Sequence, residues 1–322
     1  ETVGVSIDSI ASASLGSFTV DGTTHHQFGA DVSTDSRTTA SLTINGPTLS
    51  GTASFSADDS AKTVAAAVNN VSATTGVTAK ARTNLVLDTV SATGTYTFDL
   101  TGTGTASIST NITNQSDLRG MRDAVNAVAG TTGITASMYN GDNSRLMLTS
   151  ATGEDIKILN LANAAANNQT FKAFTTDYDG VVSGSGTVFG DATTTVLDSL
   201  IVSGEVRFTS AGAFSVVDGG TSGAGTGYMA ANTTSASATT ISSVKIGTQA
   251  NANTAIDIID GALNKIADQR ANLGAISNRL DHTVSNLGNV VINTEASKSR
   301  IEDADFAKVT GDLTKSQIMS QA

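Results

Sequence analysis

The sequence contains no cysteine, no tryptophan and a single proline, and aromatic residues make up only 4% of its 322 residues. Without cysteine the chain can form no disulfide, no thiolate nucleophile and no cysteine-ligated metal site. Ala, Ser, Thr, Gly, Asn and Asp dominate instead, so we expect thin cores built from small aliphatic side chains. The length allows more than one core and favours two or three domains.

The sequence also lacks the features of nucleic-acid-binding and membrane proteins. It has 18 Lys and Arg against 29 Asp and Glu, which gives a net charge of -11 and a pI near 4.5. This charge repels phosphates, and no basic run reverses it locally, so nucleic acid is excluded as a partner. No apolar run approaches the roughly 18 residues of a membrane span, so we expect no membrane insertion.

The two ends of the chain do not look like the ends of a protein. The chain begins at Glu1 in the strand-like stretch ETVGVSI, without an initiator methionine or a signal-peptide pattern. It stops at Ala322 without a helix stop signal. We therefore expect a piece of a longer protein.

Four regions differ in composition and patterning. Residues 1–45 alternate apolar and polar in short runs, which predicts strands and turns, and 46–180 contains an internal repeat. The third region, 181–242, is glycine-rich: we expect two or three strands up to Val217 and a surface loop or linker in GGTSGAGTGYMAANTTSASATT. The fourth, 243–322, is helical by its periodicity.

The internal repeat lies within the second region. AVNNVSATTGVTA at 67–79 returns as AVNAVAGTTGITA at 124–136, an offset of 57 residues. Each copy predicts an amphipathic helix that passes through Thr-Thr-Gly into a strand, followed by two strands joined at Gly94 or Gly153. The copies therefore predict α+β modules that pack a short helix on a small antiparallel sheet.

A long helix is predicted over 250–294, where no proline intervenes. Its apolar residues follow 3-4 spacing, which over roughly 40 residues predicts a rod of about 60 Å whose narrow apolar stripe needs partner helices. The stripe consists of Ile256, Ile259, Leu263, Ile266, Leu273, Leu280, Val284, Leu287 and Val291. A second helix is expected after Thr294, with Ser299 or Asp303 as its N-cap.

Two glycines recur in phase on this helix. Asn272-Leu273-Gly274 returns as Asn286-Leu287-Gly288, fourteen residues or two heptads later. Each glycine costs a helix roughly 1 kcal/mol against alanine. We expect Gly274 and Gly288 to let another helix approach closely, either within one subunit or between subunits.

The search for chemistry is negative. His25 and His26 are adjacent, so in a strand they face opposite sides, and the sequence has neither a P-loop nor an H-E-x-x-H motif. DYDGVVSGSG from Asp177 lacks the carboxylates that an EF-hand needs at its fifth and twelfth positions. We therefore expect no catalytic residue, cofactor or metal site, and no enzyme.

The last third of the chain resembles the carboxy-terminal core of bacterial flagellin. The motifs that carry the resemblance follow the family's order: Gln269-Arg270-Ala271, Leu273-Gly274-Ala275, Asn278-Arg279, Asn286-Leu287-Gly288 and Ser299-Arg300-Ile301-Glu302-Asp303-Ala304-Asp305. The resemblance implies an elongated, multi-domain α+β protein with a long coiled-coil-like helical rod and β-rich and small α+β outer domains. Residues 1–45 and 243–322 would belong to the rod, and 46–242 to the variable outer part. The amino-terminal helices that the family pairs with this rod are absent from the sequence.

The resemblance also implies a function, partners and a location. It implies a self-assembling structural subunit of the extracellular flagellar filament, with other flagellin subunits and an export chaperone as partners. It further implies recognition by Toll-like receptor 5, with Asn278, Arg279 and Leu280 in the matching stretch.

Two alternatives remain open beside the filament subunit. The first is a hook–filament junction protein, or a flagellin-like surface adhesin whose region 46–240 binds polysaccharide. The second is an enzyme with a hydrolytic site in that region, which contains no histidine.

Overall fold

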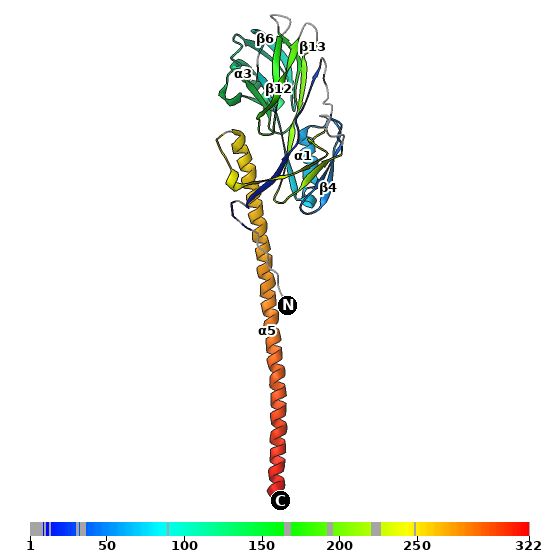
Figure 1. Ribbon diagram of the computed structural model, residues 1–322, viewed down its shortest axis with the longest axis vertical. Helices are drawn as coiled ribbons and strands as arrows, with labels where there is room; N and C mark the ends of the chain where they lie inside the picture. Colours follow the sequence, from blue (N-terminus) through cyan, green and yellow to red (C-terminus); the bar gives the residue numbers. More distant parts are fainter. Residues whose placement is uncertain are drawn as a thin grey trace. The chain divides into compact units, whose positions relative to one another are not determined.

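A computed structural model describes residues 9, 11–12, 14–29, 32, 37–88, 90–163, 169–191, 196–219, 227–247 and 249–321 (Figure 1). The chain divides into two compact units, one of residues 10–265 and one that contains Ser9 and 266–321. The first unit holds all the described strands, and the second is helical. The predicted α+β class is confirmed.

The strands of the first unit form three antiparallel sheets. The largest has the order β13-β12-β11-β5-β15-β1-β18, with β9 also paired to β5 and β8 to β9. The second has the order β2-β14-β10-β6-β7, and the third β17-β16-β3-β4. The bounds are β1 Gly16–Asp21, β2 His25–Gly29, β3 Ser41–Asn45, β4 Ser50–Ser54, β5 Val77–Asp88, β6 Gly94–Thr101, β7 Thr105–Ile112, β8 Ile134–Met138, β9 Leu146–Ser150, β10 Ile156–Asn163, β11 Gln169–Thr176, β12 Val182–Asp191, β13 Val196–Leu197, β14 Ser199–Ser203, β15 Glu205–Ser210, β16 Ser215–Asp218, β17 Thr233–Ser235 and β18 Ser237–Thr240.

The helices are short except for the last. The bounds are α1 Ala61–Asn70, α2 Ser72–Thr75, α3 Arg119–Ala127, α4 Ala129–Thr132 and α5 Gln249–Gln321, with 3₁₀ turns η1 Tyr139–Gly141 and η2 Ile241–Ser243. Figure 1 shows α5 as one unbroken helix. The break predicted after Thr294 is wrong. No proline or glycine interrupts residues 289–310, and the expected cap Ser299 instead donates a hydrogen bond to Asp303 within the helix.

The internal repeat is confirmed in atomic detail. In both copies the helix pair ends at a left-handed glycine, Gly76 or Gly133, each with φ of 71°. The side chain of Asn69 clasps both backbone groups of Ala79, since its Nδ2 donates to the carbonyl at 2.9 Å and its Oδ1 accepts from the amide at 2.8 Å. Asn126 clasps Ala136 at the same two distances. A hairpin precedes each helix pair, β3–β4 in the first copy and β6–β7 in the second.

The prediction that strands pair across the turns at Gly94 and Gly153 is wrong. β5 and β6 do not form a hairpin at Gly94, nor do β9 and β10 at Gly153. β5 pairs instead with β9 of the second copy, and β6 pairs with β10. The reason lies in β5, a 12-residue strand that is buried continuously from Thr83 to Leu87. A strand buried on both faces lies inside a large sheet, and β5 pairs with β15, β9 and β11.

The stretch predicted as a surface loop or linker is in part structured. Among its described residues, Tyr228 and Met229 are buried in the core that also contains Val64 and Val68 of α1. Residues 233–235 and 237–240 form β17 and β18. The stretch has few apolar residues, so its sequence did not indicate these contacts. One tyrosine and one methionine nevertheless bury enough apolar surface to anchor it.

Among the described residues, buried hydrophobic side chains form two clusters, one around each repeat. Val64 and Val68 of α1 lie in one, and Met121 and Val125 of α3 lie in the other. The second cluster also gathers aromatic residues that are scarce in the sequence, with the rings of Tyr96 and Phe171 edge to face at 5.0 Å. Each repeat copy thus provides a helix face to its own core.

Candidate assembly helix and its anchoring cluster

All nine residues of the predicted apolar stripe are exposed along α5. The exposed fractions of Ile256, Leu263 and Val284 are 57%, 58% and 67%, and the other six stripe residues are also exposed. Further exposed apolar residues follow toward the end of the helix, including Phe306, Val309 and Ile318. None of the described helices has the length and hydrophobicity that a membrane span requires. The stripe is therefore an apolar surface that the described residues leave uncovered.

The first turns of α5 pack onto the sheet through a different face. Ala255, Ile258 and Ala262, at 3-4 spacing, are buried. Beside them Gly261 approaches β1 closely, since a Cβ there would lie 2.4 Å from the Cβ of Ser17. Sequence reasoning missed this face, because alanine at 3-4 spacing is a weak signal beside the isoleucines of the stripe. Among the glycines of α5, the one that permits close approach to another described segment is therefore Gly261.

Gly274 and Gly288 have open space around them. A Cβ at either position would meet no atom of the described chain within 4 Å. Asn278, Arg279 and Leu280 are likewise exposed. The structure does not bring these five residues into contact with any other segment that it describes.

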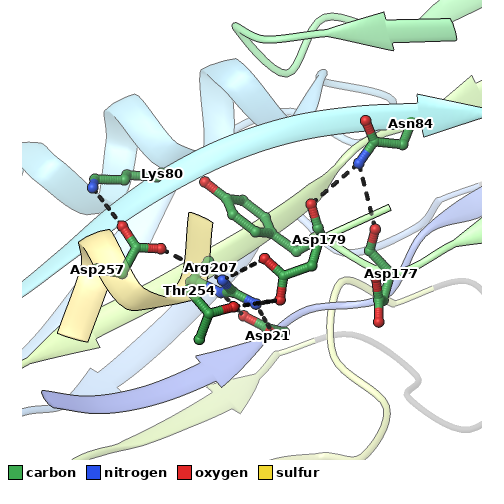
Figure 2. A network of polar contacts seen from close by, with 9 residues as sticks. Asp21, Lys80, Asn84, Asp177, Asp179, Arg207, Thr254 and Asp257 are labelled. Carbon is green, nitrogen blue, oxygen red and sulfur yellow. Dashed lines mark hydrogen bonds and ion pairs between the residues drawn. The ribbon is translucent and has the colours of Figure 1, made fainter. Parts of the chain in front are cut away.

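Polar residues from four segments fix the start of α5 to the sheet (Figure 2). Arg207 on β15 is 5% exposed by its side chain and forms a paired contact with Asp21 on β1, through Nε at 2.6 Å and Nη2 at 2.7 Å. It forms a second paired contact with Asp179, after β11, through Nη2 at 2.7 Å and Nη1 at 3.0 Å. Its Nη1 also lies 3.4 Å from Asp257 of α5. We call Asp21, Asp179, Arg207 and Asp257 the Arg207 cluster.

Two further contacts tie α5 to this cluster. The hydroxyl of Thr254 donates to Asp179 at 2.9 Å, and Nζ of Lys80 on β5 donates to Asp257 at 2.7 Å. The guanidinium of Arg207 also lies over the ring of Tyr178, 4.2 Å from its centroid. Both residues that α5 contributes, Thr254 and Asp257, thus lie in its first three turns.

The pKa values of the two cations follow from these contacts. Burial alone would lower the pKa of Arg207, but its hydrogen bonds to Asp21 and Asp179 outweigh burial and raise it. The hydrogen bond to Asp257 raises the pKa of Lys80. Both groups therefore stay charged at neutral pH, and the carboxylates around them are compensated.

The contacts of the Arg207 cluster attach the first turns of α5 to the sheet. Its carboxylates are occupied by a guanidinium and an ammonium group, and no group of three potential metal ligands occurs among the described residues. Paired Arg–carboxylate contacts fix geometry as well as charge, since both groups are planar. Sequence reasoning did not find this cluster because its members lie up to 236 positions apart, from Asp21 to Asp257.

Two protein-family descriptions match separate segments of the chain. The family description "Flagellin hook IN motif" matches residues 41–93 and 97–152, which are the two repeat copies with their hairpins. The description "Bacterial flagellin C-terminal helical region" matches 256–322, which is most of α5. The chain belongs to the bacterial flagellin family.

Named flagellins are similar over different shares of the chain. B-type flagellin of Pseudomonas aeruginosa is 35% identical over 271 residues, which cover 83% of this chain and 53% of that protein. Flagellin A of Vibrio cholerae is 54% identical over 84 residues, 26% of this chain and 22% of that protein. The chain thus spans about half the length of the first relative. Among solved structures, the chain is similar to the D2-D3 domains of the flagellar cap protein FliD from Escherichia coli, at 14% sequence identity. The match covers 61% of this chain and 98% of the FliD chain. Its TM-score of 0.21 is too low to support an argument.

Proposed function

We propose that the protein is a structural subunit of the extracellular flagellar filament and assembles with copies of itself through α5. The observation that carries the proposal is the uncovered apolar stripe of nine residues on a helix of 73 residues. Membership in the flagellin family supports it, as does the flagellin description that matches 256–322. The proposed role is structural rather than catalytic.

The physical reason is the cost of leaving the stripe in water. At 1.5 Å per residue α5 is about 110 Å long, and a helix of this length cannot cover its own apolar side. Burial of each large aliphatic side chain of the stripe contributes about 1.5–3 kcal/mol. Partner helices that cover the stripe, in a coiled-coil-like rod, would therefore link folding of the rod to polymerisation.

The test is a charge placed on the stripe of the full-length protein. We expect Leu287→Asp to abolish filaments in a strain without its own flagellin, because it buries an unpaired carboxylate in the seam. The matched control is Asn289→Asp, which places the same side chain two residues away on the opposite side of α5. Negative-stain electron microscopy and swimming assays report the outcome, and the helix content of the secreted monomer reports folding.

The outcomes separate the proposal from its alternatives. Long filaments from wild type and Asn289→Asp, with only monomer from Leu287→Asp, support the filament subunit. Filaments of normal length from Leu287→Asp contradict it. If the wild-type full-length protein forms only short or capped species, a hook–filament junction protein or an adhesin is favoured instead.

We also propose that Asn278, Arg279 and Leu280 take part in recognition by Toll-like receptor 5. Their exposure on α5 supports the proposal. We expect intact wild-type protein to activate receptor reporter cells and Arg279→Ala to activate them at least tenfold less. Arg300→Ala, an exposed arginine 21 residues further along α5, is the control. An export chaperone and the division into a rod and outer domains at residues 45, 180 and 242 also stay predictions.

A further inference from the structure

One buried acid beside the Arg207 cluster forms no ion pair among the described residues. Glu205 is the first residue of β15, two positions before Arg207, so both side chains lie on the same face of the strand. It is 5% exposed, and its Oε2 atom is fully buried without a hydrogen-bond partner among the described residues. A buried carboxylate oxygen without a partner is costly in its charged form and much less so in its protonated form.

The surroundings of Glu205 are negative. Its interactions include repulsion by Asp21, Asp177 and Asp179 and attraction by Arg207, and the guanidinium of Arg207 already holds two of these carboxylates. Other charged residues lie on elements packed against β15. Arg82 on β5 is the cross-strand partner of Glu205, and Lys80 on the same strand contacts Asp257 and Asp260 of α5. Arg37 donates to the carbonyl of Gly204, and Lys62 on α1 pairs with Glu154. Carboxylates therefore outnumber the cations in this region.

We propose that Glu205 is a proton-controlled latch for the first turns of α5, which dock onto the sheet tightly while Glu205 is protonated and less tightly as pH rises. The latch acts through its neighbours. When Glu205 ionises, its carboxylate competes for Arg207 and repels Asp21 and Asp179. The contact between Arg207 and Asp257 is the longest in the cluster, at 3.4 Å, so it is the first to be lost. Thr254 is bound to the cluster by its hydrogen bond to Asp179, and this bond is lost when Asp179 is repelled.

The direction of the pH effect follows from proton linkage. Burial, followed by repulsion from Asp21 and Asp177, raises the pKa of Glu205 to about 8 in the docked state. In an undocked state that hydrates Glu205, the pKa returns toward its ordinary value near 4.5. The docked state therefore binds more protons, so docking is fully favoured below the undocked pKa and is lost as pH rises toward 8. One proton changes the docking equilibrium by up to tenfold per pH unit in that window.

The first test measures the proton on Glu205 directly. The chain contains five glutamates, so ¹³C-carboxyl labelling of glutamate in the full chain gives few signals, and Glu205→Gln identifies the one that belongs to Glu205. We expect this signal to titrate near pH 8. Titration of Glu205 below pH 5.5 overturns the proposal.

The second test measures docking. We expect opening of the amides of residues 254–262, measured by hydrogen exchange and corrected for the intrinsic pH dependence, to increase at least tenfold from pH 6 to 8 in wild type. Glu205→Gln, which keeps the shape of the neutral acid, should make this opening independent of pH, whereas Glu302→Gln should leave the wild-type profile unchanged. Asp177→Asn removes one repelling charge and should move the end of the window to lower pH. Equal pH profiles for wild type and Glu205→Gln overturn the latch.

Discussion

At the residue scale, the attachment of the first turns of α5 to the sheet depends on Arg207. Its guanidinium is the shared partner of Asp21, Asp179 and Asp257, which come from β1, the turn after β11 and α5. Composition predicts such a residue poorly. An arginine in a strand is most often exposed, and only the folded chain shows that this one is surrounded by carboxylates.

Removal of Arg207 should be costly. We expect Arg207→Met to lower the free energy of unfolding by about 3–5 kcal/mol, because it leaves buried carboxylates without compensation. Lys80→Met is the matched control, since the side chain of Lys80 is 54% exposed and Arg207 still lies beside Asp257 to compensate its charge. For this control we expect a loss of no more than about 1 kcal/mol. Denaturant unfolding at pH 7 measures both, and equal losses would contradict the central role of Arg207.

Gly261 should tolerate alanine much less well than Gly274. A Cβ at position 261 would lie 2.4 Å from the Cβ of Ser17, so α5 has to move away from β1. We expect Gly261→Ala to cost about 1–3 kcal/mol, in the range of overpacked cores. Gly274→Ala, with open space around it, should instead stabilise the monomer's helix by roughly 1 kcal/mol. Thermal unfolding followed by circular dichroism tests the opposite signs.

At the element scale, the repeat shows what local sequence determines. The Asn side chain that clasps the strand, the left-handed glycine and the valines that face the core all lie within the repeated stretch. These contacts span 10 residues or fewer along the chain, so the repeated motif was sufficient to predict the helix, the turn and the strand. The sheet partners of β5 and β6 were not predictable, because strand pairing depends on distant segments.

The duplicated clasp gives a matched pair of variants. Asn69→Ala and Asn126→Ala each remove two hydrogen bonds to strand backbone, which contribute about 0.5–1.5 kcal/mol each. We therefore expect either substitution to cost about 1–3 kcal/mol. The neighbouring Asn70→Ala, at an exposed position without a clasp in the described structure, is the control. A loss in Asn70→Ala as large as in Asn69→Ala, measured by denaturant unfolding, would contradict the role of the clasp.

At the scale of the whole molecule, the two in-phase glycines allow a test of the proposed assembly. A Cβ at Gly274 or Gly288 would meet no other segment of the described chain, so no described contact offsets their cost to the helix. We expect the double variant Gly274→Ala, Gly288→Ala to give a folded, more helical monomer of the full-length protein with fewer or no filaments by electron microscopy. Normal filaments from this variant would show that the bare backbone serves only packing within one subunit.

The sequence by itself determined the elements whose information is local. Periodicity indicated the long helix with its apolar stripe, and self-similarity indicated the two helix–turn–strand units. The resemblance of residues 269–305 pointed to the flagellin family. These features depend on spacings of a few residues, which a single sequence displays directly.

Only the tertiary structure decided how these elements meet. It showed that the two repeats share a sheet through β5 and β9 and that α5 docks through Ala255, Ile258 and Gly261 while Ile256 and Ile259 stay exposed. It also showed that Arg207 and Glu205 lie close to acidic residues from distant segments of the chain. The physical reason is that burial and charge compensation depend on neighbours in space, and these neighbours are separated along the chain by up to about 240 residues.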